Sequence, residues 1–428
     1  MTPKDGGEGR PSPLARFRIA VNDTFVSLSS PSYRCYFASQ LLSNTGTWMQ
    51  MVAENWLIIR LHGSGLALGI STSVQFAPML VVGAYGGVLV DRWNKRRVLV
   101  VTQSSYAILA MAMAAIIASG HAAIWMVWLA GGVLGLVNVV DWPGRQAFTV
   151  EMVGATHIAN ATALNNLVTV CARAVGPGIS GLLIASAGIE TCFVVNALSY
   201  GAVVIALLGM TPVHLAREPK AMRRRGQTLH ALRSAWHQPA LRVALLMVAI
   251  VGAFGTNFQL LITLLAVQSL HAGAAAYGRL MAYLGVGMMV GSLHVARRPP
   301  ATALTVGAYA LLLGGAYALL IPDPRAVIAW GVALLGVAAG LFLAGAAARI
   351  QMLSTPGMRG RVMALFTVAI MGTTLIGGPV VGWISQKTTL KNGFAVSAVA
   401  CSAAALLTLG ETRHNRFVVG RAQKRPVR

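Results

Sequence analysis

Two charged residues fall inside long apolar segments of the sequence, where a charge is hardest to accommodate. Glu54 lies in the segment Phe37–Leu61, and Arg173 lies in the segment 159–187. A charged side chain at the centre of a lipid bilayer costs at least about 2.5–3.5 kcal/mol, so residues of this kind usually serve a function. A carboxyl group at this depth can bind and release a proton, which makes Glu54 the candidate for proton coupling. The alternative is an acid of the outer vestibule that pairs with Arg60.

Arg173 is followed by Gly176-Pro177, two residues that change a membrane helix in different ways. Glycine lets a neighbouring helix approach closely, and proline bends its own helix and frees a backbone carbonyl group. Arg173 could attract an anionic substrate or pair with Glu54. The alternative is a buried arginine that is satisfied by carbonyl groups and by polar neighbours such as Asn165.

A short basic link joins two of the apolar segments. The segment Gly86–Arg97 holds one acid, Asp91, and four bases, Arg92, Lys95, Arg96 and Arg97. Such a link between two membrane spans is typical of a tight turn on the cytoplasmic side. Another acid, Asp141, lies at the end of a further apolar segment, where it could pair with Arg145 four residues later.

Twelve apolar segments must position these residues. Hydrophobic residues make up 56% of the chain and charged residues only 11%, a composition that soluble domains do not have. A helix needs about 20 apolar residues to cross a bilayer. We therefore predict an all-α membrane protein with twelve transmembrane helices in two six-helix halves. The approximate spans are 34–61, 66–90, 98–119, 122–142, 159–187, 190–210, 241–269, 276–296, 302–321, 326–348, 362–385 and 393–410.

The two groups of spans divide the chain into five regions. These are a cytoplasmic N-terminal tail (1–32), an N-terminal six-helix half (33–210), a cytoplasmic linker (211–240), a C-terminal six-helix half (241–411) and a basic cytoplasmic tail (412–428). The pairs Gly176-Pro177 and Gly378-Pro379 lie 202 residues apart, and Gly87 and Gly291 lie 204 residues apart. Two nearly equal offsets indicate duplication of a six-span unit, as in transporters built from parallel repeats.

The charge of the chain predicts its orientation. If the N-terminus is inside, 28 of the 34 Lys and Arg residues lie on the inner side, 5 lie on the outer side, and Arg173 lies within a span. This asymmetry places both termini in the cytoplasm. A net charge of +23 is also common in nucleic-acid-binding proteins, but no basic stripe alternates with aromatic residues, so we expect no nucleic-acid partner. The four cysteines and nine histidines form no metal-binding pattern, and we expect no cofactor.

The link after the second span has the pattern G-x-x-x-D-R-x-x-K/R-R, which runs from Gly87 to Arg97. This pattern resembles the signature of the major facilitator superfamily of secondary transporters. Further stretches are similar to its exporter branch, which includes enterobactin exporters and related efflux proteins: Thr45–Gln50, Leu61–Gly69, Asn160–Asn165 and Arg359–Ala364. Glu54 departs from that branch, in which a neutral side chain is expected.

The resemblance implies roles for the charged residues near the membrane surface. Asp91 would contact the start of the eleventh helix near Arg361 and hold the two halves shut on the inner side, and Asp141 would pair with Arg92 or Arg96. A carboxylate gains typically about 0.3–1 kcal/mol at a helix N-terminus. In the alternative interpretation Asp91 only balances nearby bases at the surface, and Asp141 pairs with Arg145.

The resemblance also implies a function. We expect a monomer in the cytoplasmic membrane of a bacterium that exports a small molecule, such as a siderophore, a drug or another metabolite. Export would proceed by alternating access, with protons as the coupling ion. A proton-coupled uptake symporter is the alternative, because a fold does not determine direction or substrate. A membrane sensor that uses its basic linker is a more distant alternative, and an enzyme is not expected because no catalytic constellation occurs.

Overall fold

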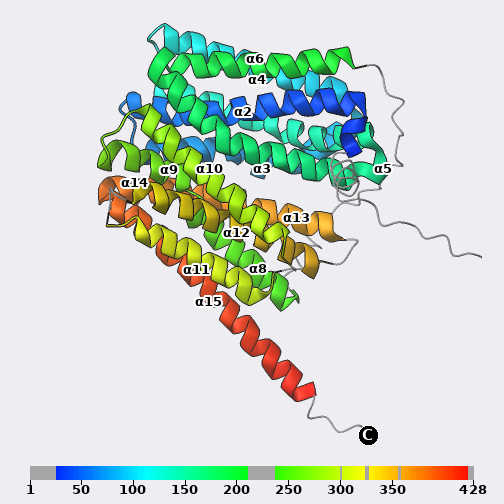
Figure 1. The fold of residues 1–428 in the computed structure, drawn as a ribbon, viewed down its shortest axis with the longest axis vertical. Coiled ribbons are helices and arrows are strands. Elements are labelled where there is room, and N and C mark those ends of the chain that lie inside the picture. The colour runs from blue at the N-terminus through cyan, green and yellow to red at the C-terminus, as the bar shows by residue number, and fades with distance from the viewer. Residues whose placement is uncertain (1–25, 211–236, 299–300, 323–326, 355–357, 423–428) are drawn as a thin grey trace, which may run out of the picture.

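The computed structural model describes residues 26–210, 237–298, 301–322, 327–354 and 358–422, and these residues form long helices joined by short turns (Figure 1). The N-terminal half consists of η1 (Val26–Ser29), α2 (Pro31–Arg60), α3 (Gly65–Arg92), α4 (Lys95–Ala118), α5 (Ile124–Ala187) and α6 (Ile189–Gly209). Three helices begin at a residue whose side chain accepts a hydrogen bond from the first turn: Ser30 for α2, Ser64 for α3 and Asn94 for α4. Such caps satisfy backbone N–H groups that have no partner within the helix.

Helix α5 contains two membrane spans. Its backbone is interrupted at Gly154, where φ is +71°, a conformation that glycine adopts without steric cost. The predicted end of the fourth span at residue 142 is therefore wrong, because the helix continues through Pro143 as far as Gly154. Asp141 consequently lies within the span rather than at its end.

The C-terminal half contains the remaining elements. They are α8 (Pro239–Ile250), η2 (Val251–Gly255), α9 (Phe258–Leu264), η3 (Leu265–Ser269), α10 (Ala274–Ala296), α11 (Ala303–Leu319), α12 (Ile328–Leu353), α13 (Arg359–Thr367), η5 (Val368–Gly372), α14 (Thr373–Lys387) and α15 (Leu390–Ala422). The elements η2, η3 and η5 are π-helical turns inside longer helices. The segment Pro239–Ser269 is thus one membrane span, and Val362–Lys387 is another.

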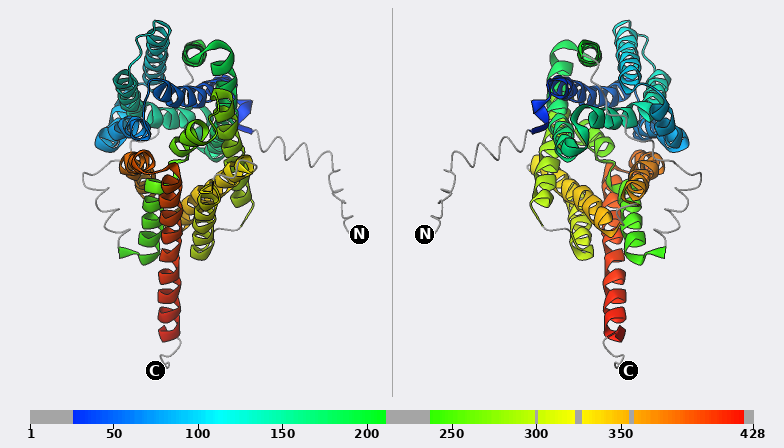
Figure 2. Two further views of the ribbon diagram at one scale, coloured as in Figure 1. Left: turned by 90° about the vertical axis from the view of Figure 1, so that its left-hand side faces the viewer. Right: turned by 90° about the vertical axis from the view of Figure 1, so that its right-hand side faces the viewer.

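The number of membrane spans agrees with the prediction. In the described part of the chain, ten helical segments are long and apolar enough to cross a membrane. The more polar α2, with 30 residues, and the shorter α11, with 17 residues, bring the total to twelve. The last helix continues to Ala422, beyond the predicted end at residue 410, and extends out of the bundle (Figure 2).

The halves meet at one end of the bundle and diverge toward the other. Helix α10 packs against α5, and α14 packs against α3. From these contacts the halves spread toward the end where α2 begins and α15 ends, which we call the termini end (Figure 1). We call the opposite end the far end.

Hydrogen bonds and a close backbone contact join the halves nearer the far end. Asn55 donates to Tyr277 at 3.3 Å, Ser73 donates to the carbonyl oxygen of Leu375 at 2.6 Å, and Gln259 donates to the sulfur of Met51 at 2.7 Å. The approach of α10 to α5 depends on glycine, because a Cβ atom on Gly278 would lie 2.6 Å from the carbonyl oxygen of Pro177.

Candidate functional site

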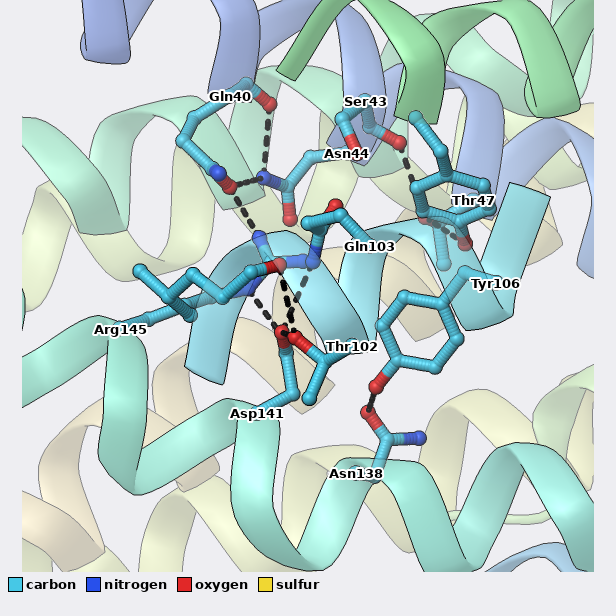
Figure 3. Close-up of polar contacts among 12 residues, drawn as sticks. Gln40, Ser43, Asn44, Thr47, Thr102, Gln103, Tyr106, Asn138, Asp141 and Arg145 are labelled. Carbon is cyan, nitrogen blue, oxygen red and sulfur yellow. Dashed lines mark hydrogen bonds and ion pairs between the residues drawn. The ribbon is translucent and has the colours of Figure 1, made fainter. Parts of the chain in front are cut away.

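The N-terminal half holds a buried ion pair in its core (Figure 3). Asp141 is only 3% exposed, and each of its carboxylate oxygens has partners. Its Oδ2 accepts a 2.5 Å hydrogen bond from Nε of Arg145, and its Oδ1 accepts from Oγ1 of Thr102 at 2.6 Å and from Nε2 of Gln103 at 2.8 Å. These donors compensate the carboxylate for the loss of water.

Arg145 extends this cluster to α2. Its Nη1 donates to Oε1 of Gln40, and Asn44 donates to the same oxygen at 3.3 Å. Asp141 thus pairs with Arg145, as one of the two interpretations expected. Arg96 instead donates to the carbonyl oxygens of Leu207 and Leu208, at 2.6 and 2.7 Å, and Arg92 is an exposed residue at the end of α3.

Polar and aromatic side chains continue from this ion pair toward the far end. Tyr106 donates to Asn138 at 2.7 Å, and its ring centroid lies 5.1 Å from that of Tyr200. Tyr200 in turn shares a 2.9 Å hydrogen bond with Thr47 of α2. The core of this half is therefore polar along much of its length, in contact with α2, α4, α5 and α6.

Glu54 lies at the far-end limit of this polar core. Its Oε1 accepts a 2.8 Å hydrogen bond from Nε2 of Gln50, whose Oε1 accepts from Nδ2 of Asn196 at 2.7 Å. Glu54 is half-buried and pairs with neither Arg60 nor Arg173. An amide neighbour on one carboxylate oxygen leaves the other oxygen able to take up a proton.

Arg173 lies between the two halves, without a carboxylate partner among the described residues. Its guanidinium carbon lies 4.4 Å from the centroid of the Trp48 ring, and its Nη1 donates to the sulfur of Met288 at 3.6 Å. A desolvated cation–π contact stabilises a cation by about 2 kcal/mol or more, which offsets much of the cost of placing it in a membrane.

Gly176 and Pro177 shape the surroundings of Arg173. A Cβ atom on Gly176 would lie 2.8 Å from the carbonyl oxygen of Thr45, so glycine permits α2 to pack closely against α5. Pro177 faces the other neighbour, α10, through its contact with Gly278. The two residues thus contact different halves.

The basic link has a well-defined backbone. Helix α3 ends at Arg92, Trp93 is extended, and Asn94 caps α4. Lys95 forms a 3.3 Å ion pair with Glu151 of α5. The surroundings of Gly87 and the side chains of Asp91 and Arg361 are not among the features that the structure describes, so the predicted contact between Asp91 and the start of the eleventh helix stays a prediction.

Several residues of the polar core were not predicted as site residues. Gln40, Thr102, Gln103 and Tyr200 lie in apolar segments, and their polar side chains were the only signal in the sequence. Spacing adds one clue, because Gln40 and Asn44 are four residues apart and share one face of α2. Among the described residues, no group of three or more His, Cys, Asp or Glu could hold a metal ion.

The membrane-spanning helices, arranged in two halves, define a multi-pass membrane protein. Residues 22–415 match the major facilitator family described as transmembrane secretion effectors, and the chain belongs to that family. It is a membrane transporter and not an enzyme. The expected resemblance to the exporter branch is confirmed.

Two named relatives illustrate the family. The enterobactin exporter EntS of Salmonella typhimurium is 24% identical, over 90% of this chain and 94% of that protein. The staphyloferrin A transporter of Staphylococcus aureus is 25% identical, over 42% of this chain and only 45% of that protein.

Solved structures support the fold. The nucleoside transporter NupG aligns with a TM-score of 0.70 at 12% identity and covers 89% of this chain and 98% of that one. A bacterial homologue of the lysosomal transporter Spinster, in an inward-facing and unoccupied conformation, aligns with a TM-score of 0.70 at 15% identity, over 89% of this chain and 95% of that one.

Proposed function

We propose that this protein exports a small molecule of the siderophore class from the bacterial cytoplasm in exchange for protons. The observation that carries the proposal is the similarity to proteins named as enterobactin exporters, which extends over 90% of the chain. A drug or another metabolite is the alternative cargo. One chain suffices for the proposed cycle, because it contains both halves, and we therefore propose a monomer.

The orientation proposed here places both termini in the cytoplasm. It rests on the excess of Lys and Arg, 28 against 5, in the segments that would face inward. With this orientation the contacts between the halves lie toward the outside and the diverging ends lie toward the cytoplasm, an arrangement that suits uptake of cargo from within. Reporter fusions at Arg223 test it, and an external reporter would contradict it.

The proposed coupling assigns the proton to Glu54. This carboxyl group has an amide partner, no ion pair among the described residues, and a position close to contacts between the halves. A proton bound from outside would accompany the halves as they rock and would leave on the inner side. One charge crossing the membrane potential supplies about 2.3 kcal/mol per 100 mV.

We further propose that Asp91 and Arg361 close the termini end after cargo has bound. The support is the intact link from Gly87 to Arg97, which has the spacing of the superfamily signature. In this scheme the contact between Asp91 and Arg361, which we call the latch, forms when the far end of the bundle opens. The same contact breaks when the far end closes again. Arg92 and Arg96 would stabilise the link near the membrane surface, the latter through its bonds to the end of α6.

Transport in everted membrane vesicles tests direction and coupling together. Vesicles containing the protein receive an inwardly acidic proton gradient and a labelled cargo from a panel of siderophores, including enterobactin, and antibiotics. An exporter accumulates its cargo, whereas an uptake symporter loses it. Accumulation that persists after the gradient is collapsed would contradict proton antiport, and loss of cargo on imposing the gradient would contradict export.

A further inference from the structure

Arg173 lies in the contact between α5 and α10, which joins the two halves. Helix α10 packs along α5. Starting at the far end, Gly181 contacts Gly278, and closer to the termini end Ala174 contacts Gly285. The bond between Arg173 and Met288 is the contact of this series nearest the termini end. A ligand that arrives from the termini end therefore reaches this arginine before the tightly packed glycines.

The guanidinium charge has no counter-ion within the described chain. Asp141 pairs with Arg145, Glu151 pairs with Lys95, and Glu54 is bound by Gln50. The neighbours of Arg173 itself are a neutral indole ring and a thioether sulfur, which is a weak acceptor. Its Nε is buried without a partner among the described residues. A buried cation with such neighbours is under-compensated, and an anion would complete its surroundings.

The geometry of the Trp48 contact leaves the arginine able to bind an anion. The guanidinium carbon lies over the Trp48 ring, which contacts the group without accepting a conventional hydrogen bond from it. Of the five N–H donors, one from Nη1 is directed to the sulfur of Met288 and that of Nε has no partner among the described residues, so donors remain for an anion. A carboxylate or phenolate matches this row of donors and forms shorter, stronger hydrogen bonds than the sulfur of Met288 does.

We propose that Arg173, held by Trp48, binds the anionic group of the transported molecule, and that this anion takes the place of Met288 as hydrogen-bond acceptor. Trp48 and Arg173 belong to the N-terminal half and Met288 belongs to the C-terminal half. Binding would exchange a contact between the halves for a contact with cargo, which couples occupancy to their separation. This inference rests on the proposed function and specifies its cargo as a small organic anion.

Equilibrium dialysis of two probes of nearly the same shape tests the charge requirement. The full chain is placed in phosphatidylcholine nanodiscs and dialysed against 2-naphthoate or the neutral 2-naphthamide, with empty nanodiscs correcting for uptake by lipid. Wild-type protein should bind the anion about tenfold or more tightly than the amide, in keeping with the usual strength of charged hydrogen bonds. Equal affinity for the two probes, or no binding of the anion, would overturn the inference.

Three variants assign the preference to this residue. Arg173→Gln should remove the preference, and Arg173→Lys should keep part of it because the charge remains but the fork of donors is lost. Arg279→Gln, at an exposed arginine of α10, should leave it unchanged. An Arg173→Gln protein that is monodisperse and retains the preference would overturn the inference. If Arg173→Gln does not fold, loss of part of the preference in Arg173→Lys supports the inference, and its full retention contradicts it.

The result of the dialysis experiment can be distinguished from the result of the vesicle experiment that tests the proposed function. Dialysis reports binding at Arg173 without any gradient, whereas the vesicle assay reports export of any cargo, charged or neutral. Export of a neutral cargo without anion binding would remove the inference and leave the transporter proposal intact. Anion binding without export in vesicles would remove the proposal of export and leave the anion site at Arg173 intact.

Discussion

Nε of Arg145 lies 2.5 Å from Oδ2 of Asp141, one turn earlier on the same helix, and the acid is 3% exposed. The pair is therefore more than a helix-surface contact of residues four apart. Thr102 and Gln103 from α4 complete the coordination of the acid, and Gln40 from α2 accepts from the base. The ion pair links three helices of the N-terminal half.

Asp141→Asn should destabilise the protein by about 3 kcal/mol, the lower end of the range for breaking a buried pair, because Arg145 keeps some exposure. The substitution leaves the guanidinium group without its counter-charge. Unfolding in detergent micelles, followed by loss of helical signal, measures the effect. The double variant Asp141→Asn/Arg145→Gln should recover part of the loss, since no buried charge then remains. A double variant no more stable than the single one would refute this explanation.

Glu54→Gln should uncouple export from the proton gradient. A glutamine at this position can still accept the hydrogen bond from Gln50, so the local structure is preserved while the proton site is lost. Everted vesicles with a pH-sensitive dye measure proton movement when cargo is added. Arg60→Gln serves as the control, because Arg60 is exposed and does not pair with Glu54. Unaltered proton movement in Glu54→Gln would exclude Glu54 as the carrier.

Gly278→Val should shift the protein away from the arrangement in which the far end is closed. Its Cβ atom would lie 2.6 Å from the carbonyl oxygen of Pro177, and backbone atoms cannot yield as side chains do. Labelling of a reporter cysteine at Asn55 with an impermeant maleimide should become faster as the halves separate. Gly315→Val is the matched control in the same half, because its Cβ atom would meet nothing within 4 Å. Equal labelling rates in both variants would contradict the prediction.

Asp91→Asn should slow transport while leaving the protein in the membrane. A carboxylate at a helix N-terminus contributes about 0.3–1 kcal/mol, so the latch equilibrium should change by about two- to fivefold. Initial rates of cargo uptake into vesicles, normalised to the amount of protein, measure the change. Asp91→Glu keeps the charge and should lose less activity. Flux in Asp91→Asn equal to that of the wild type would remove the latch from the scheme.

Most of the spans could be predicted from hydropathy, because ten of the described helical segments are long and apolar enough to cross a bilayer. The end of the fourth span could not. Pro143 and Gly144 follow Asp141 and are ordinary signals for the end of a helix, yet the helix continues to Gly154. In a membrane, neighbouring helices can satisfy the carbonyl group that a proline frees, so the usual stop signal fails.

The partners within the site depended on information that one sequence does not contain. Asp141 had two interpretations, a pair with Arg145 or a pair with Arg92 or Arg96 of the basic link, and the i to i+4 spacing favoured the first only as strongly as the family resemblance favoured the second. The choice follows from the rotation of α5, which directs Asp141 toward Thr102 and Gln103 of α4. Rotation of apolar helices leaves little trace in hydropathy, because lipid-facing and core-facing side chains are equally apolar.

The three π-helical turns, η2, η3 and η5, all belong to the C-terminal half as far as the chain is described. At η2 and η5 the two interrupted helices meet, and the carbonyl oxygen of Gly252 accepts from Thr256 at 2.7 Å and from Thr374 at 2.8 Å. Two hydroxyl groups thus bind one carbonyl oxygen at the point where the two π-helical turns contact each other, and such turns are places where a helix commonly bends. In the part of the chain that the structure describes, the π-helical turns thus distinguish the C-terminal half from the N-terminal half, whose core holds the pair of Asp141 and Arg145, so the two halves differ in internal construction.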